Sequence, residues 1–160
     1  MAERLARIFA AQLGIPDITT SSAGIHAMIG SGIHAEAARV IKEYGGDAEV
    51  FAARQINAKI ASGADLILTM TRTHRDVVLE LAPRMLRRTY TLKGAAELTT
   101  GWNVQRVDEL AVLRNHIPAN ESLDIADPIG QSPEFFTAVG AHISDLMPPV
   151  LRFCQSAANT

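Results

Sequence analysis

The chain has 160 residues, 48% of them hydrophobic, which predicts one globular domain over residues 1–154 with a short tail at 155–160. A formal net charge of −2 argues against nucleic-acid binding, and no apolar run approaches the ~20 residues that span a bilayer. A single cysteine, Cys154, excludes an intrachain disulfide. We therefore expect a soluble, cytoplasmic protein.

The N-terminal residues predict an amphipathic helix that begins at Met1, with no strand before it. Its apolar face is formed by Met1, Leu5, Ile8, Phe9 and Leu13, and Gly14 ends it. Residues 18–24 are rich in threonine, serine and isoleucine and predict a strand. Apolar residues recur at helical spacing over 33–44 and predict a second helix, and a short helical turn follows Asn57.

The unbroken apolar run at residues 65–70 predicts a parallel strand that is covered on both faces, at the centre of a sheet. Thr71 or Thr73 caps the next predicted helix, which Pro83 ends, and residues 89–92 predict a further strand. Strands that alternate with helices indicate βαβ units. The predicted fold class is therefore a three-layer α/β fold, in which helices flank a parallel sheet.

Residues 104–111 predict another amphipathic helix, and a polar loop follows over 115–124. The last predicted helix has Ser132 as its N-cap and Pro133 at its first position. Two consecutive prolines at 148–149 should kink or break this helix, because each removes a backbone donor and crowds the preceding turn.

The segment 124–130, with the sequence DIADPIG, places two carboxylates on a turn directly before a helix. Pro128 restricts the backbone of Asp127, which suits a general acid that must be held in one orientation. An Asp-Pro pair before a helix is also ordinary turn chemistry, so the spacing leaves both interpretations open.

Three other patterns carry weaker hypotheses. Residues 30–35 match G-x-G-x-x-A, with Glu49 at a suitable distance for a ribose contact, but residues 27–29 are short for the strand that a dinucleotide site requires. The five histidines show no spacing typical of metal ligands, so we expect no metal site. The basic cluster of Arg84, Arg87 and Arg88 is interpreted as a solvated face.

Five short segments stand in the order and at the intervals of a known family: residues 22–24 (SAG), 53–55 (ARQ), 64–71, 88–92 and 124–128. Together they resemble a bacterial low-molecular-weight protein tyrosine phosphatase, from Met1 to about Leu151. In that family a first central strand leads into a C-x5-R loop, and this chain begins at the Met-Ala-Glu that follows the loop. Two departures bear on substrate binding: Ile129 replaces a usual aromatic residue and Ile25 a usual threonine.

The resemblance implies that Asp127 is the catalytic general acid, that a phosphotyrosine protein is the partner once the loop is restored, and that no cofactor is needed. The nucleophilic cysteine and the phosphate-binding arginine are absent from the 160 residues, and no arginine follows Cys154 at the required spacing. We therefore expect the polypeptide as written to be inactive, and the absent strand to leave sheet edges that favour a homodimer. A noncatalytic binding or assembly module and an unrelated small-molecule-binding α/β domain remain alternatives.

Overall fold

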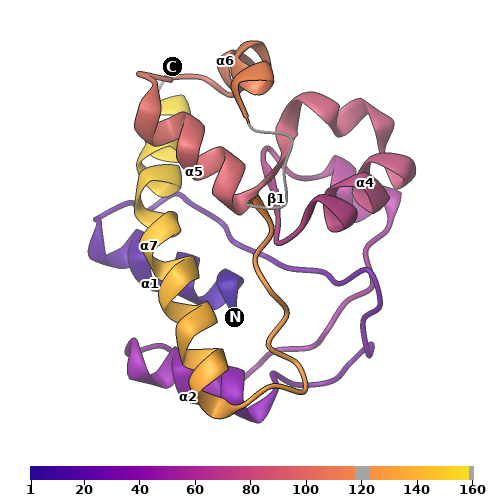
Figure 1. The fold of residues 1–160 in the computed structure, drawn as a ribbon, viewed down its shortest axis with the longest axis vertical. Helices are drawn as coiled ribbons and strands as arrows, with labels where there is room; N and C mark the ends of the chain where they lie inside the picture. The colour runs from indigo at the N-terminus through magenta and orange to yellow at the C-terminus, as the bar shows by residue number, and fades with distance from the viewer. Residues whose placement is uncertain (118–122, 159–160) are drawn as a thin grey trace.

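The computed structural model describes residues 1–117 and 123–158 and shows helices on either side of a small parallel sheet. On one side lie α1 (Ala2–Gln12), α5 (Leu92–Gly101) and α7 (Pro133–Ala158), and on the other lie α3 (Ala58–Ser62) and α4 (Arg72–Leu81) (Figure 1). The remaining helices are α2 (Ala35–Glu43), α6 (Val107–Leu113) and the 3-10 helices η1 (Pro83–Arg88) and η2 (Arg114–His116). The predicted three-layer α/β class is confirmed.

The described sheet consists of β1 (Ile67–Thr69) and β2 (Thr89–Thr91), which pair in parallel with Ile67 opposite Thr89. Both strands were predicted, but β1 is not central within the described sheet, because β2 is its only ladder partner there. Consistent with that position, Ile67 and Leu68 are only half-buried, and Thr69 alone is buried. The predicted central position of this strand is therefore not found within the described sheet, and its burial is less complete than predicted.

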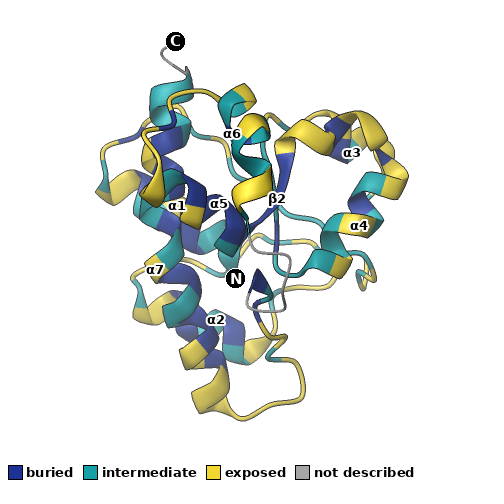
Figure 2. Cartoon of the chain, turned by 45° about the horizontal axis from the view of Figure 1, so that its top comes forward, coloured by how far each residue is buried: buried dark blue, intermediate teal, exposed yellow. Residues whose placement is uncertain are grey.

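The main core lies between α1, α5 and α7 and contains most of the buried apolar side chains (Figure 2). Leu5 of α1 is fully buried there, beside Leu92 and Leu98 of α5 and Val150 of α7. A second cluster joins α2 to α7 through Val40 and Phe136. No helix within the described ranges is long and apolar enough to cross a bilayer.

The strand predicted at residues 18–24 does not form. This segment runs without a ladder, and Gly24 alone makes a parallel bridge, with Gln55. Instead, Thr20 and Ser22 donate side-chain hydrogen bonds to Glu3 of α1, so the segment is held against the helix rather than against a strand. Local β-propensity was present, but among the described residues no adjacent backbone pairs with it along its length.

Two helical predictions also need correction. Helix α5 was not predicted, and residues 148–149 do not break α7, which continues from Pro133 to Ala158. The prolines are tolerated because Met147, Val150 and Leu151 around them are buried in the main core, and this packing offsets the lost hydrogen bonds. Half of the predicted 115–124 loop, residues 118–122, lies outside the described residues, and the loop's first two residues belong to η2.

Candidate active site

The segment that carries Asp127 starts at the carboxyl end of β1. The backbone N–H of Ile125 donates to the carbonyl oxygen of Met70 at 2.8 Å, directly after the strand. Leu123 and Ile125 are buried, and beyond them the chain runs from the sheet to the start of α7 (Figure 1, orange). Ligand sites in open α/β sheets form at this carboxyl edge, so the fold delivers Asp127 to the expected place.

Asp124 fastens this segment to the first turn of α4. Its carboxylate accepts the backbone N–H of Arg72 at 2.8 Å, and the guanidinium of Arg72 approaches the two carboxylate oxygens at 3.4 and 3.5 Å. Desolvation by itself would raise the pKa of Asp124, but the hydrogen bonds and charge of Arg72 outweigh it and hold the pKa below its usual value. Asp124 is therefore an ionised anchor, unsuited to donating a proton.

Asp127 is placed differently from Asp124, because its side chain is exposed to solvent. Its Oδ1 atom accepts the backbone N–H of Ile129 at 3.0 Å, which forms a local turn around Pro128. The turn orients the carboxyl group, and no cation among residues 1–117 and 123–158 forms an ion pair with it. Of the two carboxylates in this segment, Asp127 is thus the more accessible to a bound molecule.

The SAG and ARQ segments recognised in the sequence lie side by side. The N–H of Gly24 donates to the carbonyl of Arg54, and the N–H of Ile56 donates to the carbonyl of Gly24, both at 2.9 Å. The Gln55 amide bridges the same loop, donating to the carbonyl of Ile25 at 2.7 Å and accepting the N–H of Ala27 at 2.9 Å. Two segments 30 residues apart therefore form one rigid unit.

This unit is also tied to the start of α1. Ser22 donates to a carboxylate oxygen of Glu3 at 2.5 Å, and Arg7 forms an ion pair with the other oxygen at 3.2 Å. The Arg54 guanidinium donates to the carbonyl of Ser22 from the opposite side. Ser22 and Gln55 lie in segments that the sequence marked, but their hydrogen bonds and the part of Glu3 were not predicted, since these depend on contacts between distant segments.

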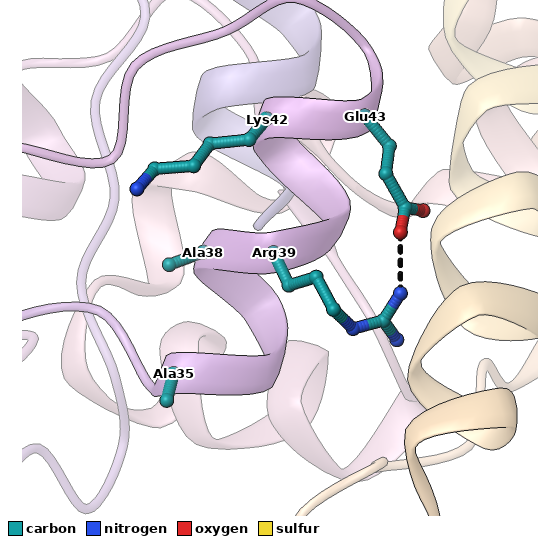
Figure 3. A pocket seen from close by; sticks show the side chains of 5 residues that line it. All are labelled: Ala35, Ala38, Arg39, Lys42 and Glu43. Carbon is teal, nitrogen blue, oxygen red and sulfur yellow. Dashed lines mark hydrogen bonds and ion pairs between the residues drawn. The ribbon is translucent and has the colours of Figure 1, made fainter.

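The remaining candidates lie elsewhere. Residues 25–29, before the G-x-G-x-x-A match, form no strand, so the strand that a dinucleotide site requires there is absent. His34 instead caps α2 by accepting the N–H of Glu36 at 3.3 Å. No group of three or more metal-ligating side chains occurs among the described residues. A shallow surface hollow of about 630 Å³ lies on α2 between Ala35, Ala38 and Lys42, where Arg39 and Glu43 form an ion pair (Figure 3).

Cys154 cannot act as a nucleophile where it stands. Burial within α7, with a smaller contribution from Asp65, raises the pKa of its thiol to about 11. Attack on phosphorus requires a thiolate, and at neutral pH this thiol is protonated. This agrees with the expectation that Cys154 does not replace a phosphatase cysteine.

Comparison with known proteins decides the family. Residues 1–96 match the family described as low molecular weight phosphotyrosine protein phosphatase. The chain belongs to the low-molecular-weight protein tyrosine phosphatase family. The phosphatase Wzb of Salmonella typhimurium is 31% identical over 138 residues, which are 86% of this chain and 73% of the relative.

Two further likenesses show the breadth of this phosphatase family. A protein-arginine-phosphatase of Geobacillus stearothermophilus is 28% identical over 133 residues, covering 83% of this chain and 74% of the relative. The crystal structure of the tyrosine phosphatase AmsI of Erwinia amylovora superposes with a TM-score of 0.69 at 25% identity, covering 94% of this chain and 81% of that one. The fold is therefore shared by relatives named for two kinds of phosphorylated side chain.

Proposed function

We propose that this phosphatase-family chain takes part in the hydrolysis of phosphotyrosine on proteins, with Asp127 as the general acid. The observation that carries the proposal is the exposed Asp127 side chain, held by a turn at the carboxyl edge of the sheet, in a chain of this family. A phenolate is a poor leaving group unless it is protonated as it departs. A carboxylic acid held at the mouth of the sheet supplies that proton.

In the proposed reaction a cysteine thiolate forms a bond to phosphorus while the bond from phosphorus to the tyrosine oxygen breaks. The proton of Asp127 goes to the departing phenolate oxygen, and the phosphoryl group stays on sulfur. Water then attacks phosphorus and gives its proton to the Asp127 carboxylate, which releases phosphate and the thiolate. Asp124, ionised and bound to Arg72, holds the loop that carries the acid.

We further propose that the 160 residues alone do not complete this cycle. Their one thiol is Cys154, protonated and far along the chain from Asp127, and the nucleophile of the family belongs to a C-x5-R loop. Such a loop binds phosphate through backbone N–H groups and lowers the pKa of its cysteine, and neither effect can come from Asp127. An acid without a nucleophile leaves no covalent pathway.

The test compares hydrolysis of para-nitrophenyl phosphate by the 160-residue chain and by the same chain with a C-x5-R segment joined ahead of Met1. We expect that the extended chain hydrolyses the compound and that the 160-residue chain does not. The Asp127→Asn variant of the extended chain should lose about 10²–10⁴-fold in kcat. Asp76→Asn, an exposed carboxylate on α4, is the matched control and should retain activity. Vigorous hydrolysis by the 160-residue chain that Asp127→Asn abolishes would refute its inactivity.

If the extended chain is also inactive although folded, the noncatalytic alternative gains support and the role of Asp127 is lost. The substrate class has its own test, because one relative is named for phosphoarginine. We propose phosphotyrosine, since the relative that is 31% identical is named for tyrosine. Faster release of phosphate from a phosphoarginine peptide than from the matching phosphotyrosine peptide would reverse this choice.

We also propose that the chain forms a homodimer and works in the reducing cytoplasm. Support for the dimer comes from β1, whose Ile67 and Leu68 are only half-buried beside an edge that no described strand covers. Light scattering on the purified chain should give twice the monomer mass. A stable monomer at micromolar concentration would contradict the dimer.

A further inference from the structure

A basic hollow of about 450 Å³ lies at the amino edge of the sheet, opposite the edge that carries Asp127. Its lining comes from η1, from the start of α6 and from the end of α7 and consists of Arg87, Arg88, Arg106, Val107, Asp108 and Ala157. Arg88 directly precedes β2, whereas Asp127 follows the residues that pair with the end of β1. Because the strands are parallel, the two sites are separated by the length of the sheet.

The charges of this basic hollow are only partly compensated. Asp108 pairs with Arg106 through contacts of 3.0 and 3.4 Å, so these two groups balance each other. Among the residues that the structure describes, the one ion-pair partner of Arg88 is Asp65, at 3.8 Å, and that carboxylate is fully exposed. The Arg87 guanidinium has no hydrogen-bond or ion-pair partner among the described residues, although its backbone carbonyl accepts from Tyr90 at 2.9 Å.

Two guanidinium groups with spare donors thus face one concave surface of a chain whose net charge is −2. An arginine with unused N–H donors can bind a carboxylate through two parallel hydrogen bonds, because its planar guanidinium group matches the spacing of the two carboxylate oxygens. Side-chain hydrogen bonds hold the local backbone in place: the guanidinium of Arg114, from η2, donates to the carbonyls of Leu86 and Thr89 on either side of Arg87 and Arg88. These bonds fix the backbone from which the Arg87 and Arg88 side chains extend into the hollow.

We propose that this basic hollow is a docking site for an acidic peptide segment of a partner protein, separate from the candidate active site. Arg87 and Arg88 would bind carboxylates of the segment, and Val107 with Ala157 would contact its aliphatic stems. The volume lies within the ~300–1,000 Å³ of binding sites for small ligands and short side-chain groups. A nucleic acid is disfavoured, because it requires a longer basic stripe than these few arginines provide.

The probe is a fluorescein-labelled peptide of ten glutamates, titrated with the full 160-residue chain and followed by fluorescence anisotropy in low salt. Arg87→Glu and Arg88→Glu should each raise the Kd at least about fivefold, because each removes an attraction and adds a repulsion. Arg84→Glu is the matched control: it lies on the same η1 helix, changes the net charge equally and is not part of the lining, so it should change the Kd less than about twofold.

Three outcomes would overturn the proposal. Equal weakening by Arg84→Glu would mean that the overall field, and not the hollow, attracts the peptide. Binding of a ten-lysine peptide as tight as that of the glutamate peptide would exclude a charge-selective site. Tighter binding of a ten-nucleotide single-stranded DNA would favour nucleic acid. If Arg87→Glu fails to fold, Arg87→Gln carries the same comparison, since it removes the charge while keeping a polar side chain.

Discussion

Removal of the Asp124 carboxylate should loosen the segment that carries Asp127 and destabilise the fold. The hydrogen bond from the Arg72 backbone, 2.8 Å long, contributes about 1.5–3 kcal/mol as a bond to a charged group. The two guanidinium contacts are longer, at 3.4 and 3.5 Å, and add about 0.2–1 kcal/mol. Asp124→Ala should therefore lower the free energy of unfolding by about 2 kcal/mol, and Tm by about 4–8 °C for a chain of this length.

Asp124→Asn keeps an oxygen for the Arg72 backbone and should cost only about 0.5–1 kcal/mol at pH 7. The folded pKa of Asp124 is depressed, so its ionised form contributes stability above the unfolded pKa of about 3.9, and this contribution is lost as pH falls through the folded pKa. Urea unfolding of wild type and Asp124→Asn should consequently converge between about pH 5 and pH 2.5.

The exposed Asp76, paired with its neighbour Arg75, supplies the control: Asp76→Asn should change the free energy of unfolding by less than about 0.5 kcal/mol. The reasoning fails if Asp124→Ala costs no more than Asp76→Asn. It also fails if the gap between wild type and Asp124→Asn is the same at pH 7 and at pH 2.5.

Phe136→Ala should destabilise the protein by about 3–5 kcal/mol, measured by urea unfolding, since this buried ring joins α7 to α2. A cost below 1 kcal/mol would show that the α2 cluster contributes little. Iodoacetamide should alkylate Cys154 at least about 100-fold more slowly in folded than in urea-unfolded protein at pH 8, because burial raises its pKa to about 11; equal rates would contradict this. Gly140→Ala places a Cβ 2.5 Å from Val40 and should cost about 1–3 kcal/mol, whereas Gly101→Ala meets open space and should be neutral or slightly stabilising by thermal unfolding. The reverse order would refute the tight contact of α2 with α7.

The elements predicted well from the sequence are those with local signals. Thr71 caps α4 by accepting the N–H of His74, as its position before the helix indicated, and Ser132 stands before α7 as predicted. By contrast, α5 carries Gly94 and two threonines, which weaken helix propensity, and its buried residues face several sides. The helix forms because the hydroxyl of Thr91 caps it and because it packs against α7, and the second of these is a tertiary effect.

In the candidate site, too, local features could be predicted from the sequence and contacts between distant segments could not. Asp127 could be found from its sequence neighbours, because the Asp-Pro turn that orients it spans only residues 127–129. Its placement depends on Arg72 and Asp124, which are 52 residues apart, and on the bond from Ile125 to Met70. No spacing within either segment encodes these contacts.

The two carboxylates of this segment therefore differ in chemistry for a reason that their sequence alone conceals. Both precede the same helix, yet Asp124 meets a cation and a backbone donor, whereas Asp127, within the described part of the chain, meets only a backbone donor of its own turn. A cation beside a carboxyl group favours the ionised form, so Asp124 suits an anchor, and the proposed proton donor is a different residue. Their spacing of three residues lets one stay fixed to α4 while the other remains exposed, and an exchange of the two roles would require Arg72 to move.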